Sequence, residues 1–321
     1  MKVLVFGATG FVGSAVARAF LERGHEVTGV GRSEGNTSVI VKLGMTPVIA
    51  DYSDRPAMAA LAGKHDVTVF AAMIDWAEEQ PLFAAIFDAL RHSGKTFLYT
   101  SGTGVLSIAN QLGHWNESTF AEDDLFPFTP TAQSQLRLDT EAMVRAVAAD
   151  GIRSFVMRPG MIWGHGGSIH IPRIFDSAIR TGAACYMGLG LNLYSNIHVD
   201  DLAEAYALAH ERGAPGAVYH AVAGEANFRS VAEAVATVVG CDARSVDYED
   251  ACAIWSRGWV DLAIAVNSRS LCPRTRSELG WLPTRLDMIE DIRSGSYRDT
   301  YQSRTGWAAS GYHYAGAHAA D

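Results

Sequence analysis

Three glycines near the start of the chain have the spacing of a phosphate-binding turn. They lie in the segment GATGFVG (residues 7–13), which follows the apolar run 2–6 and opens residues 11–23, whose apolar side chains recur with helical spacing. Between a strand and a helix, glycine allows a tight turn and close approach of the backbone to a pyrophosphate, and the helix N-terminus offers free N–H groups. The segment therefore predicts a dinucleotide site. Its predicted cofactor-binding residues are Gly7, Thr9, Gly10, Phe11, Val12 and Gly13.

The end of the second expected strand indicates which dinucleotide is bound. Proteins that bind NAD usually place an acidic residue there to accept a hydrogen bond from the adenosine ribose. This chain has Val30-Gly31-Arg32-Ser33 instead. Arg32 and Ser33 are suited to a 2′-phosphate, so we expect NADPH (or NADP⁺) as the cofactor, with NADH less favoured. The alternative is that Arg32 is a solvated surface residue.

Aromatic and sulfur-containing residues lie in segments expected to be loops beyond the strands, where α/β sheets bind ligands. This set suits a flat or aromatic substrate better than a diphosphosugar. His165 and His170 lie in the same region and are weaker candidates for an acid, because a single histidine is more often structural. The predicted substrate residues are Asp75, Trp76, Trp115, Trp163, Tyr186, Met187 and Tyr194.

The elements that would position these residues alternate between strands and helices. Strands are expected at 2–6, 26–30, 47–50, 67–72, 96–100 and 153–157, and helices at 11–23, 56–62, 81–93 and 131–149. Such alternation is typical of βαβ units and a parallel sheet. The predicted fold class is α/β, a Rossmann-type doubly wound parallel sheet with a smaller, mostly C-terminal substrate domain.

The pattern changes after Arg158, where residues 160–196 are rich in glycine and aromatic side chains. A helix at 199–212 and a strand at 217–221 are expected to return the chain to the sheet. The sequence therefore predicts three regions. They are a dinucleotide-binding domain of residues 1–160 plus about 197–223, a substrate domain of about 161–196 plus 224–301, and a loose tail at 302–321.

Composition argues against several other classes of protein. The 321 residues are 48% hydrophobic and carry a formal net charge of −9, which disfavours nucleic acid as a partner. The sequence lacks any run of about 18 apolar residues, so we expect no membrane span. The four cysteines are widely spaced and form no CxxC motif, so free thiols are expected, with no metal site. With no export signal evident, the cytoplasm is the expected compartment.

Taken in order, several short motifs resemble the short-chain dehydrogenase/reductase superfamily, in its extended or atypical branch of epimerase- and dehydratase-like proteins. The motifs are GATGFVG, Asp51-Tyr52, Ala71-Ala72-Met73, Thr100-Ser101-Gly102, Arg158-Pro159-Gly160, Trp163-Gly164, the segment 198–203 and Glu278-Leu279-Gly280-Trp281. The resemblance implies that Asp51 and Tyr52 flank the adenine. It also implies that Ala71, Ala72, Met73 and Thr100 line the dinucleotide path, and that Pro159, Gly160 and Met161 approach the nicotinamide. Asp200 would then cap the helix that follows it.

One family feature is missing from this chain. Most relatives carry a Tyr-x-x-x-Lys pair after the fifth strand, but residues 100–150 contain neither tyrosine nor lysine. Gln133 falls at the tyrosine position and Arg137 at the lysine position, where Arg137 could still hold a ribose hydroxyl. Glutamine cannot serve as a general acid. A hydroxyl of Ser101 or Thr103 could polarise a carbonyl, or both could simply satisfy backbone groups in a turn. The predicted catalytic residues are Ser101, Thr103 and Gln133.

These observations favour an NADPH-dependent atypical ketoreductase acting on an aromatic or polycyclic natural product, as in secondary metabolism. Hydride transfer depends mainly on positioning, so it tolerates the missing pair better than epimerase or dehydratase chemistry does. Two alternatives stay open, a nucleotide-sugar epimerase or dehydratase and a non-catalytic sensor of NADP(H). A homodimer through the helices at 81–93 and 131–149 is a further option.

Overall fold

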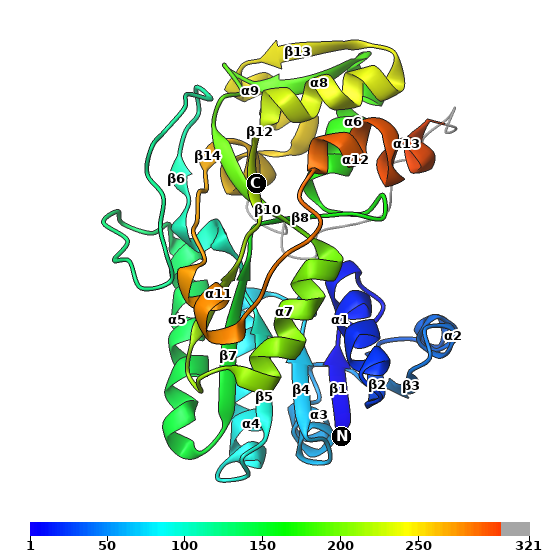
Figure 1. The fold of residues 1–321 in the computed structure, drawn as a ribbon, viewed down its shortest axis with the longest axis vertical. Coiled ribbons are helices and arrows are strands. Elements are labelled where there is room, and N and C mark those ends of the chain that lie inside the picture. The colour runs from blue at the N-terminus through cyan, green and yellow to red at the C-terminus, as the bar shows by residue number, and fades with distance from the viewer. Residues whose placement is uncertain (303–321) are drawn as a thin grey trace.

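A seven-stranded parallel sheet forms the lower half of the molecule in Figure 1, the computed structural model, which describes residues 1–302. The strand order is β11-β7-β5-β4-β1-β2-β3, and every neighbouring pair is parallel. The chain changes direction across the sheet between β1 and β4, the kind of point where such sheets bind ligands. The predicted Rossmann-type fold is therefore confirmed. The strands are β1 (Lys2–Phe6), β2 (Glu26–Gly31), β3 (Thr46–Ile49), β4 (Val67–Phe70), β5 (Thr96–Thr100), β7 (Arg153–Pro159) and β11 (Val218–Ala221).

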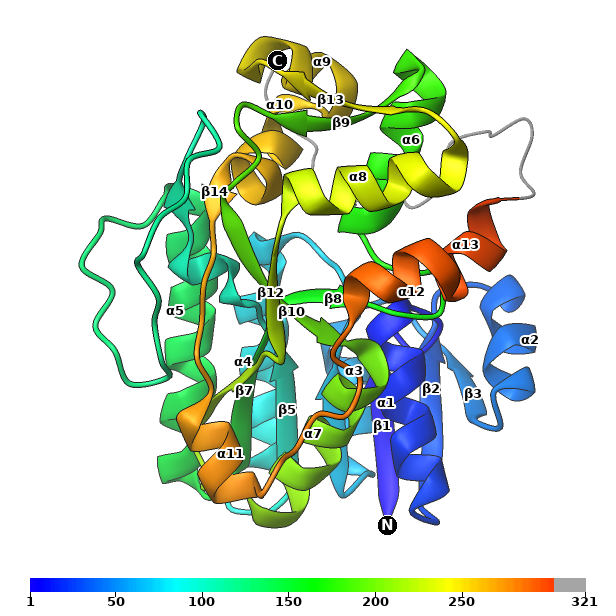
Figure 2. The ribbon, with the colours of Figure 1, turned by 45° about the horizontal axis from the view of Figure 1, so that its top comes forward.

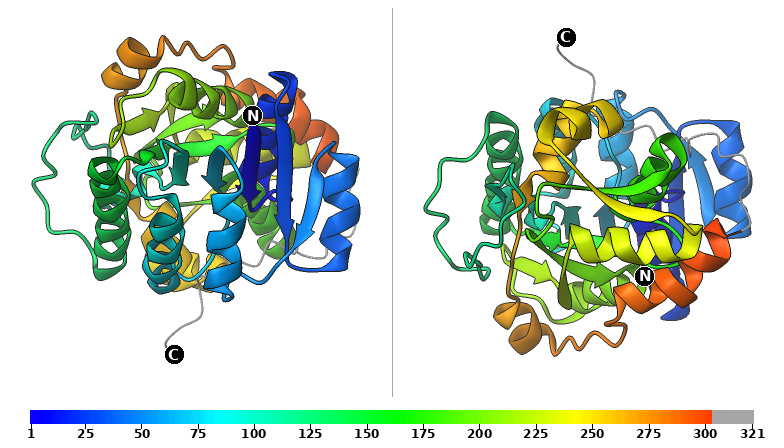
Figure 3. Two further views of the ribbon diagram at one scale, coloured as in Figure 1. Left: turned by 90° about the horizontal axis from the view of Figure 1, so that it is seen from below. Right: turned by 90° about the horizontal axis from the view of Figure 1, so that it is seen from above.

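Helices cover both faces of this sheet, as the view from below in Figure 3 shows. Helices α1 (Phe11–Glu22) and α7 (Val199–Arg212) pack together on one face, in a buried cluster with Val3, Val5 and Trp281. Helices α3 (Arg55–Gly63), α4 (Trp76–Leu90) and α5 (Ala132–Ala146) cover the other face, where Phe83 and Phe97 are buried. Both layers leave the carboxyl ends of the strands open toward the upper half of the molecule.

The upper half contains smaller sheets and a separate buried cluster (Figures 1 and 2). Strand β10 pairs with β8 in parallel and with β12 antiparallel, and β9 pairs with β13 in parallel. The elements are β8 (Met161–Trp163), α6 (His170–Thr181), β9 (Ala183–Met187), β10 (Leu193–His198), β12 (Gly224–Asn227), α8 (Phe228–Val239), β13 (Asp242–Val246), α9 (Tyr248–Trp255), α10 (Arg257–Trp259), a π-helical segment (Val260–Ile264), α12 (Met288–Ser294) and α13 (Ser296–Tyr301). Further elements are β6 (Ile108–Ala109) and β14 (Val266–Asn267), which pair with each other, and α11 (Pro273–Leu279).

One expected helix begins at another residue in the structure, and one helix was missed. Helix α4 begins at Trp76 rather than Pro81, because the Asp75 carboxylate accepts the Ala77 N–H and starts the helix five residues earlier. Helix α2 (Glu34–Lys42) was not predicted. It buries only Ile40 and therefore has almost no apolar periodicity to detect.

The two-domain division stays a prediction, and residues 303–321 of the predicted tail lie outside the described residues. Within residues 1–302, no helix is both long enough and apolar enough to span a lipid bilayer. All four cysteines are free thiols, with Cys185 and Cys272 buried.

Candidate functional site

A cavity of about 440 Å³ lies where the sheet meets the upper half of the molecule. The ends of β1, β2, β4, β5 and β7 form its floor, and α6, β10 and the segment around Trp259 form its roof. It brings together residues that the sequence analysis selected from eight separate segments. The predicted site residues that line the cavity are Gly7, Thr9, Gly10, Phe11, Val12, Arg32, Tyr52, Ala71, Ala72, Met73, Trp76, Thr100, Ser101, Arg137, Pro159, Gly160 and Tyr194.

The glycine turn forms a closely packed part of the cavity wall. Gly7 has φ +77°, and a Cβ there would lie 2.5 Å from the Ala71 carbonyl oxygen. Gly13 does not line the cavity but packs beneath the turn, where a Cβ would lie 2.2 Å from the Gly7 oxygen. Gly10 caps α1 without offering a side-chain acceptor to the N–H groups of the first turn. The turn is therefore a backbone cradle at a helix N-terminus, which fits a pyrophosphate.

The adenosine end of the cavity is lined by Arg32 and Asn36. Asn36 Oδ1 accepts the Arg32 N–H at 3.2 Å and lies 3.2 Å from Ser33 Oγ. Ser33 therefore supports the turn rather than lining the cavity. Asp51 also stays outside, and its carboxylate accepts the Ser53 N–H, a bond that lowers the pKa of Asp51. Tyr52 does line the cavity, and its hydroxyl accepts the Gly7 N–H at 3.0 Å.

No aspartate or glutamate occurs among the described residues that line the cavity. A carboxylate to accept the adenosine 2′-hydroxyl is thus missing among them, and Arg32 lies at the adenosine end instead. The glycine turn and Arg32 fit a nicotinamide dinucleotide.

Only one of the three predicted catalytic residues reaches the cavity. Ser101 lines it, but its hydroxyl donates to Glu141 at 2.5 Å, and Glu141 in turn forms a buried ion pair with Arg158. A serine hydroxyl has one proton, so in this arrangement Ser101 does not donate to a carbonyl. Thr103 is fully buried beneath the site, with its hydroxyl 3.4 Å from Ser268 Oγ.

Gln133 is exposed on the first turn of α5, and its neighbour Ser134 lines the cavity in its place. The helical register thus brings a serine, not the glutamine, toward the site. Met161 is buried next to the cavity rather than lining it.

Arg137 lies in a network that the sequence analysis did not anticipate. Its Nη1 donates to Glu79 and to the Tyr99 hydroxyl, each at 2.7 Å, and its guanidinium lies 4.4 Å from the centre of the Trp76 ring. Glu79 is 1% exposed, and burial raises its pKa although Arg137 and Tyr99 act in the opposite direction. Arg137 lines the cavity with its charge paired to Glu79. Glu79 was missed because its segment was read as a loop.

Five of the seven predicted substrate residues lie outside the cavity. Asp75 caps α4, and Trp115 is 58% exposed near Arg269. Trp163 is buried and donates to Asn196 at 3.0 Å. The other two, Tyr186 and Met187, belong to β9 in the upper core. Position in a predicted loop did not reveal which way these side chains point.

The roof contains aromatic residues that only tertiary structure brings together. The His170 ring lies between Tyr194 and Trp259, with ring centres 5.3 Å and 5.1 Å away. Leu262 and Ala263 of the π-helical segment complete this apolar wall. Trp259 was not selected from the sequence, since no local motif surrounds it.

Burial lowers the pKa of His170 to about 3, and the neighbouring charge of Arg173 adds to the effect. The folded protein therefore holds this ring neutral at pH values where the unfolded chain, with a histidine pKa near 6.5, takes up a proton. Stability should consequently fall as the pH drops below about 6.5. Between pH 7 and 4.5, the free energy of unfolding should fall by on the order of 1–2 kcal/mol less in His170→Asn than in the parent protein.

Urea unfolding at both pH values measures this, with His114→Asn at an exposed site as the matched control. The control should lose stability as steeply as the parent protein does. If His170→Asn also does so, the fold does not hold the His170 ring neutral.

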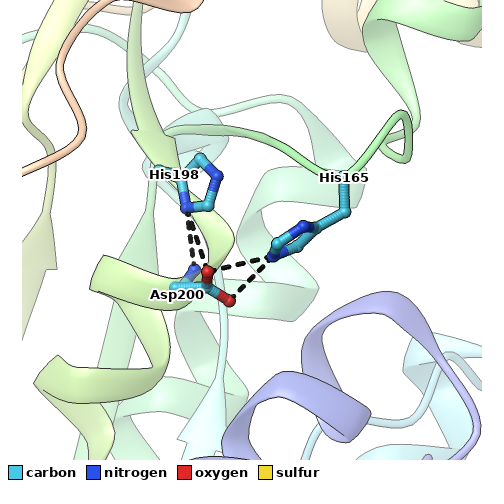
Figure 4. A group of neighbouring side chains, drawn as sticks. All are labelled: His165, His198 and Asp200. Atoms are coloured by element: carbon cyan, nitrogen blue, oxygen red, sulfur yellow. Dashed lines mark hydrogen bonds and ion pairs between the residues drawn. The ribbon is translucent and has the colours of Figure 1, made fainter. Parts of the chain in front are cut away.

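A charged cluster connects the loop after β8 to the start of α7 (Figure 4). His165 Nε2 lies 2.9 Å from the Asp200 carboxylate, and Arg18 of α1 donates to the same group at 2.5 Å. Burial acts to raise the pKa of Asp200, but its hydrogen bond with His165 and the charge of Arg18 hold the pKa below its ordinary value. His198 Nδ1 accepts the Asp200 N–H at 3.1 Å, so His198, and not Asp200, caps α7.

Ligand atoms of His165, His198 and Asp200 lie within 4.8 Å of one another, a spacing compatible with a metal ion. However, the lone pair of His198 Nδ1 is already used by the helix cap, and Asp200 is paired with Arg18. The arrangement therefore works as an ion-pair network that ties the loop to α1 beside the glycine turn.

Comparison with known proteins agrees with this geometry. Residues 3–223 match the model of the NAD dependent epimerase/dehydratase family. The chain belongs to this family. Members of this family and the relatives below are NAD(P)-dependent oxidoreductases, and so is this protein.

A 2-alkyl-3-oxoalkanoate reductase from Stenotrophomonas maltophilia is 31% identical over 247 residues, covering 73% of this chain and 71% of the relative. A 4-hydroxy-2-methyl-3-oxo-4-farnesyl-3,4-dihydroquinoline-1-oxide ketoreductase from Stigmatella aurantiaca is 27% identical over 232 residues, covering 68% and 67%. The structure of a dTDP-glucose 4,6-dehydratase from Bacillus anthracis in complex with NAD matches with a TM-score of 0.73 at 16% identity. It covers 94% of this chain and 96% of that chain. At that identity the likeness concerns the fold alone.

Proposed function

We propose that this protein is an NADPH-dependent reductase of a ketone on an aromatic or polycyclic small molecule. The observation that carries the proposal is the chemistry of the cavity wall, where no Asp, Glu, Lys or Cys occurs among the described lining residues. Epimerases and dehydratases need a base to remove a proton from carbon or oxygen, and the described lining offers no carboxylate, amine or thiolate for it, only Tyr52, Tyr194 and a His170 whose pKa burial lowers to about 3, which makes it a weak base. Reduction of a ketone needs mainly correct placement of the carbonyl carbon, which a rigid apolar pocket provides.

NADPH, when bound, would supply a hydride to the carbonyl carbon. The turn at Gly7 and Gly10 would hold its pyrophosphate through backbone N–H groups, and Arg32 with Asn36 would hold its 2′-phosphate. The backbone at Pro159 and Gly160 would position the nicotinamide end. These residues bind and orient the cofactor without exchanging protons with it.

The substrate side of the cavity consists of Trp76, His170, Tyr194, Trp259 and Leu262. Aromatic walls favour flat, apolar ligands through large contact areas and offset stacking. The names of two relatives, an oxoalkanoate reductase and a dihydroquinoline-oxide ketoreductase, support a ketone as the reacting group. A role in secondary metabolism follows from this class of substrate.

Loss of NADPH absorbance with a panel of ketones tests the proposal. The panel contains isatin, menadione and ethyl 2-methyl-3-oxobutanoate, with UDP-glucose as the sugar-nucleotide comparison. We expect steady NADPH oxidation with at least one carbonyl compound. Conversion of UDP-glucose without net NADPH consumption would instead indicate an epimerase, and tight NADPH binding without any turnover would indicate a sensor.

We also propose a cytoplasmic location, which the free cysteine thiols favour. A homodimer through α4 and α5 stays a prediction, because both helices already bury apolar residues against the sheet. Light scattering measured with the purified protein would decide it.

A further inference from the structure

We propose that His170, the first residue of α6, donates a hydrogen bond to the ketone oxygen of the substrate through the N–H of a neutral imidazole. The inference rests on the proposed reductase function and names a donor for a chain without the usual tyrosine. His170 was a weaker candidate for an acid in the sequence analysis. In the role proposed here it polarises the carbonyl group and keeps its proton.

The His170 side chain belongs to the cavity wall at the point where α6 begins. Three consecutive residues, Ser168, Ile169 and His170, line this part of the wall. The Ser168 hydroxyl accepts the His170 N–H at 3.1 Å, and Ser168 has φ +133°, a conformation that residues with side chains rarely adopt. The Tyr297 hydroxyl donates to the Gly167 carbonyl oxygen in the same turn. The surrounding structure therefore fixes the backbone from which the imidazole extends.

Two aromatic rings restrict the direction of the imidazole. Tyr194 of β10 and Trp259 of α10 flank it, with ring centres 5.3 Å and 5.1 Å from its own and ring planes tilted by 60° and 54°. Within residues 1–302, neither ring nitrogen of His170 has a hydrogen-bond partner. Polar atoms in protein interiors are nearly always paired, so a ring held in this way on a cavity wall is suited to pair with a ligand.

The imidazole lies close to the proposed nicotinamide end of the cavity. Its neighbour Tyr194 precedes Ser195, whose carbonyl oxygen a Cβ on Gly160 would overlap. The Tyr194 hydroxyl oxygen lies 3.4 Å from where a Cβ of Gly104 would be, in the loop after β5. Gly104 and Gly160 both line the cavity. One aromatic ring thus separates His170 from the wall that would face the nicotinamide, a gap that a flat substrate can span.

The charge state of His170 decides which kind of donor it is. Burial lowers its pKa to about 3, and the charge of Arg173 on the same helix acts in the same direction. The side chains that flank the ring from other elements are Tyr194, which is titratable, and Trp259, which is not. Near neutral pH the ring is therefore neutral, with one N–H that donates and one nitrogen that accepts. Such an N–H stabilises negative charge on oxygen as it develops in the transition state.

Two other hydroxyl groups of the cavity wall are committed elsewhere. Ser101 donates its proton to Glu141 and cannot donate it to a carbonyl at the same time. The Tyr52 hydroxyl accepts the Gly7 N–H at 3.0 Å, at the phosphate-binding turn. Polarisation of the ketone therefore falls to a group on the roof of the cavity.

The step balances with NADPH as the reductant and water as the proton source. The carbonyl carbon gains the hydride with its two electrons, and the C–O π electrons move to the oxygen. The His170 N–H stabilises the negative charge on that oxygen and stays on the ring. Water then supplies the proton that completes the alcohol, and the hydroxide formed is neutralised by the buffer.

The test compares His170→Phe with the parent protein on the ketone that the parent reduces fastest. Phenylalanine keeps an aromatic ring and removes the N–H, so we expect kcat to fall about 10²- to 10³-fold, as for loss of one oxyanion donor, while NADPH affinity changes less than about threefold. His170→Asn and His170→Gln restore an N–H, and at least one of them should keep kcat within about tenfold of the parent value. His114→Gln, at an exposed site, is the control and should behave as the parent does.

The pH profile separates a neutral donor from an acid. A neutral N–H does not titrate between about pH 6 and 8.5, so His170 should add no ionisation to the kcat profile of the parent in this range. An imidazolium acid would instead make kcat fall as the pH rises through its pKa. If the parent shows such a fall and His170→Gln removes it, His170 acts as an acid and the inference is wrong.

The possible failures are distinguishable. If kcat of His170→Phe falls less than about tenfold, or if Ser134→Ala or Tyr194→Phe alone shows the large loss, His170 is not the donor although the reductase function stands. Equal losses in the Phe, Asn and Gln variants would show that packing of the ring, and not its N–H, is what matters. If the parent oxidises NADPH with no ketone of the panel, the reductase function fails and this inference falls with it. Circular dichroism and NADPH titration establish that each variant is folded.

Discussion

Gly13→Ala is expected to weaken dinucleotide binding at least a hundredfold, about 2.8 kcal/mol. The added Cβ would lie 2.2 Å from the Gly7 oxygen and 2.7 Å from the Gly7 carbonyl carbon, which is backbone and cannot move aside as a side-chain end can. Relief requires the turn to shift away from α1, and this shift moves the N–H groups that face the cavity. Fluorescence titration with NADPH measures the effect.

Gly63→Ala is the matched control, because a Cβ there meets no atom within 4 Å and the residue lies at the end of α3. Alanine favours helix over glycine, so this variant should bind NADPH as the parent does. Unchanged affinity in a folded Gly13→Ala protein would show that the turn tolerates displacement and does not form the phosphate cradle.

Glu79→Ala is expected to lower the free energy of unfolding by about 3–5 kcal/mol. Glu79 is 1% exposed and holds Arg137, whose side chain is 17% exposed, together with the Tyr99 hydroxyl. Removing the carboxylate takes the buried negative charge away from the Arg137 guanidinium and leaves the Tyr99 hydroxyl proton without its acceptor. The loss would be a large share of the 5–15 kcal/mol typical of folded domains. Urea unfolding monitored by circular dichroism measures it.

The neighbouring Glu78 gives a matched control. Its pair with Arg55 at 2.8 Å is exposed, with side chains 61% and 42% accessible, so Glu78→Ala should cost at most about 1 kcal/mol. The double variant Glu79→Leu/Arg137→Met should recover most of the stability, because both charges leave together. A loss below 1 kcal/mol for Glu79→Ala would mean that water reaches Arg137 freely.

The sequence predicted the part of the site that depends on local chain geometry. The turn at residues 7–13 needs glycine for reasons internal to one strand, one turn and one helix, and Gly7 and Gly13 show those constraints. Arg32 was predicted from its place at the end of a strand, and it lines the cavity. Such features repeat within short segments, so periodicity and spacing are enough to detect them.

Most residues predicted for the substrate side do not line the cavity, because lining it depends on side-chain direction and distant contacts. Trp163 and Met187 lie in the expected region but point into the core, and Trp259 reaches the cavity from a segment without any motif. The register of helix α5 turns Ser134, and not Gln133, toward the cavity. Pro81 was taken as a helix start, although Asp75 begins the helix earlier and thereby places Glu79 beneath Arg137.

The central claim, that this cavity binds NADPH through Arg32, is tested most directly by titrating the parent protein and Arg32→Ala with NADPH and NADH. We expect the parent to bind NADPH at least tenfold more tightly than NADH, about 1.4 kcal/mol, and Arg32→Ala to remove that difference while leaving NADH affinity unchanged. Equal affinities of the parent for both dinucleotides would contradict the NADPH assignment. Absence of binding by either would contradict the dinucleotide site itself.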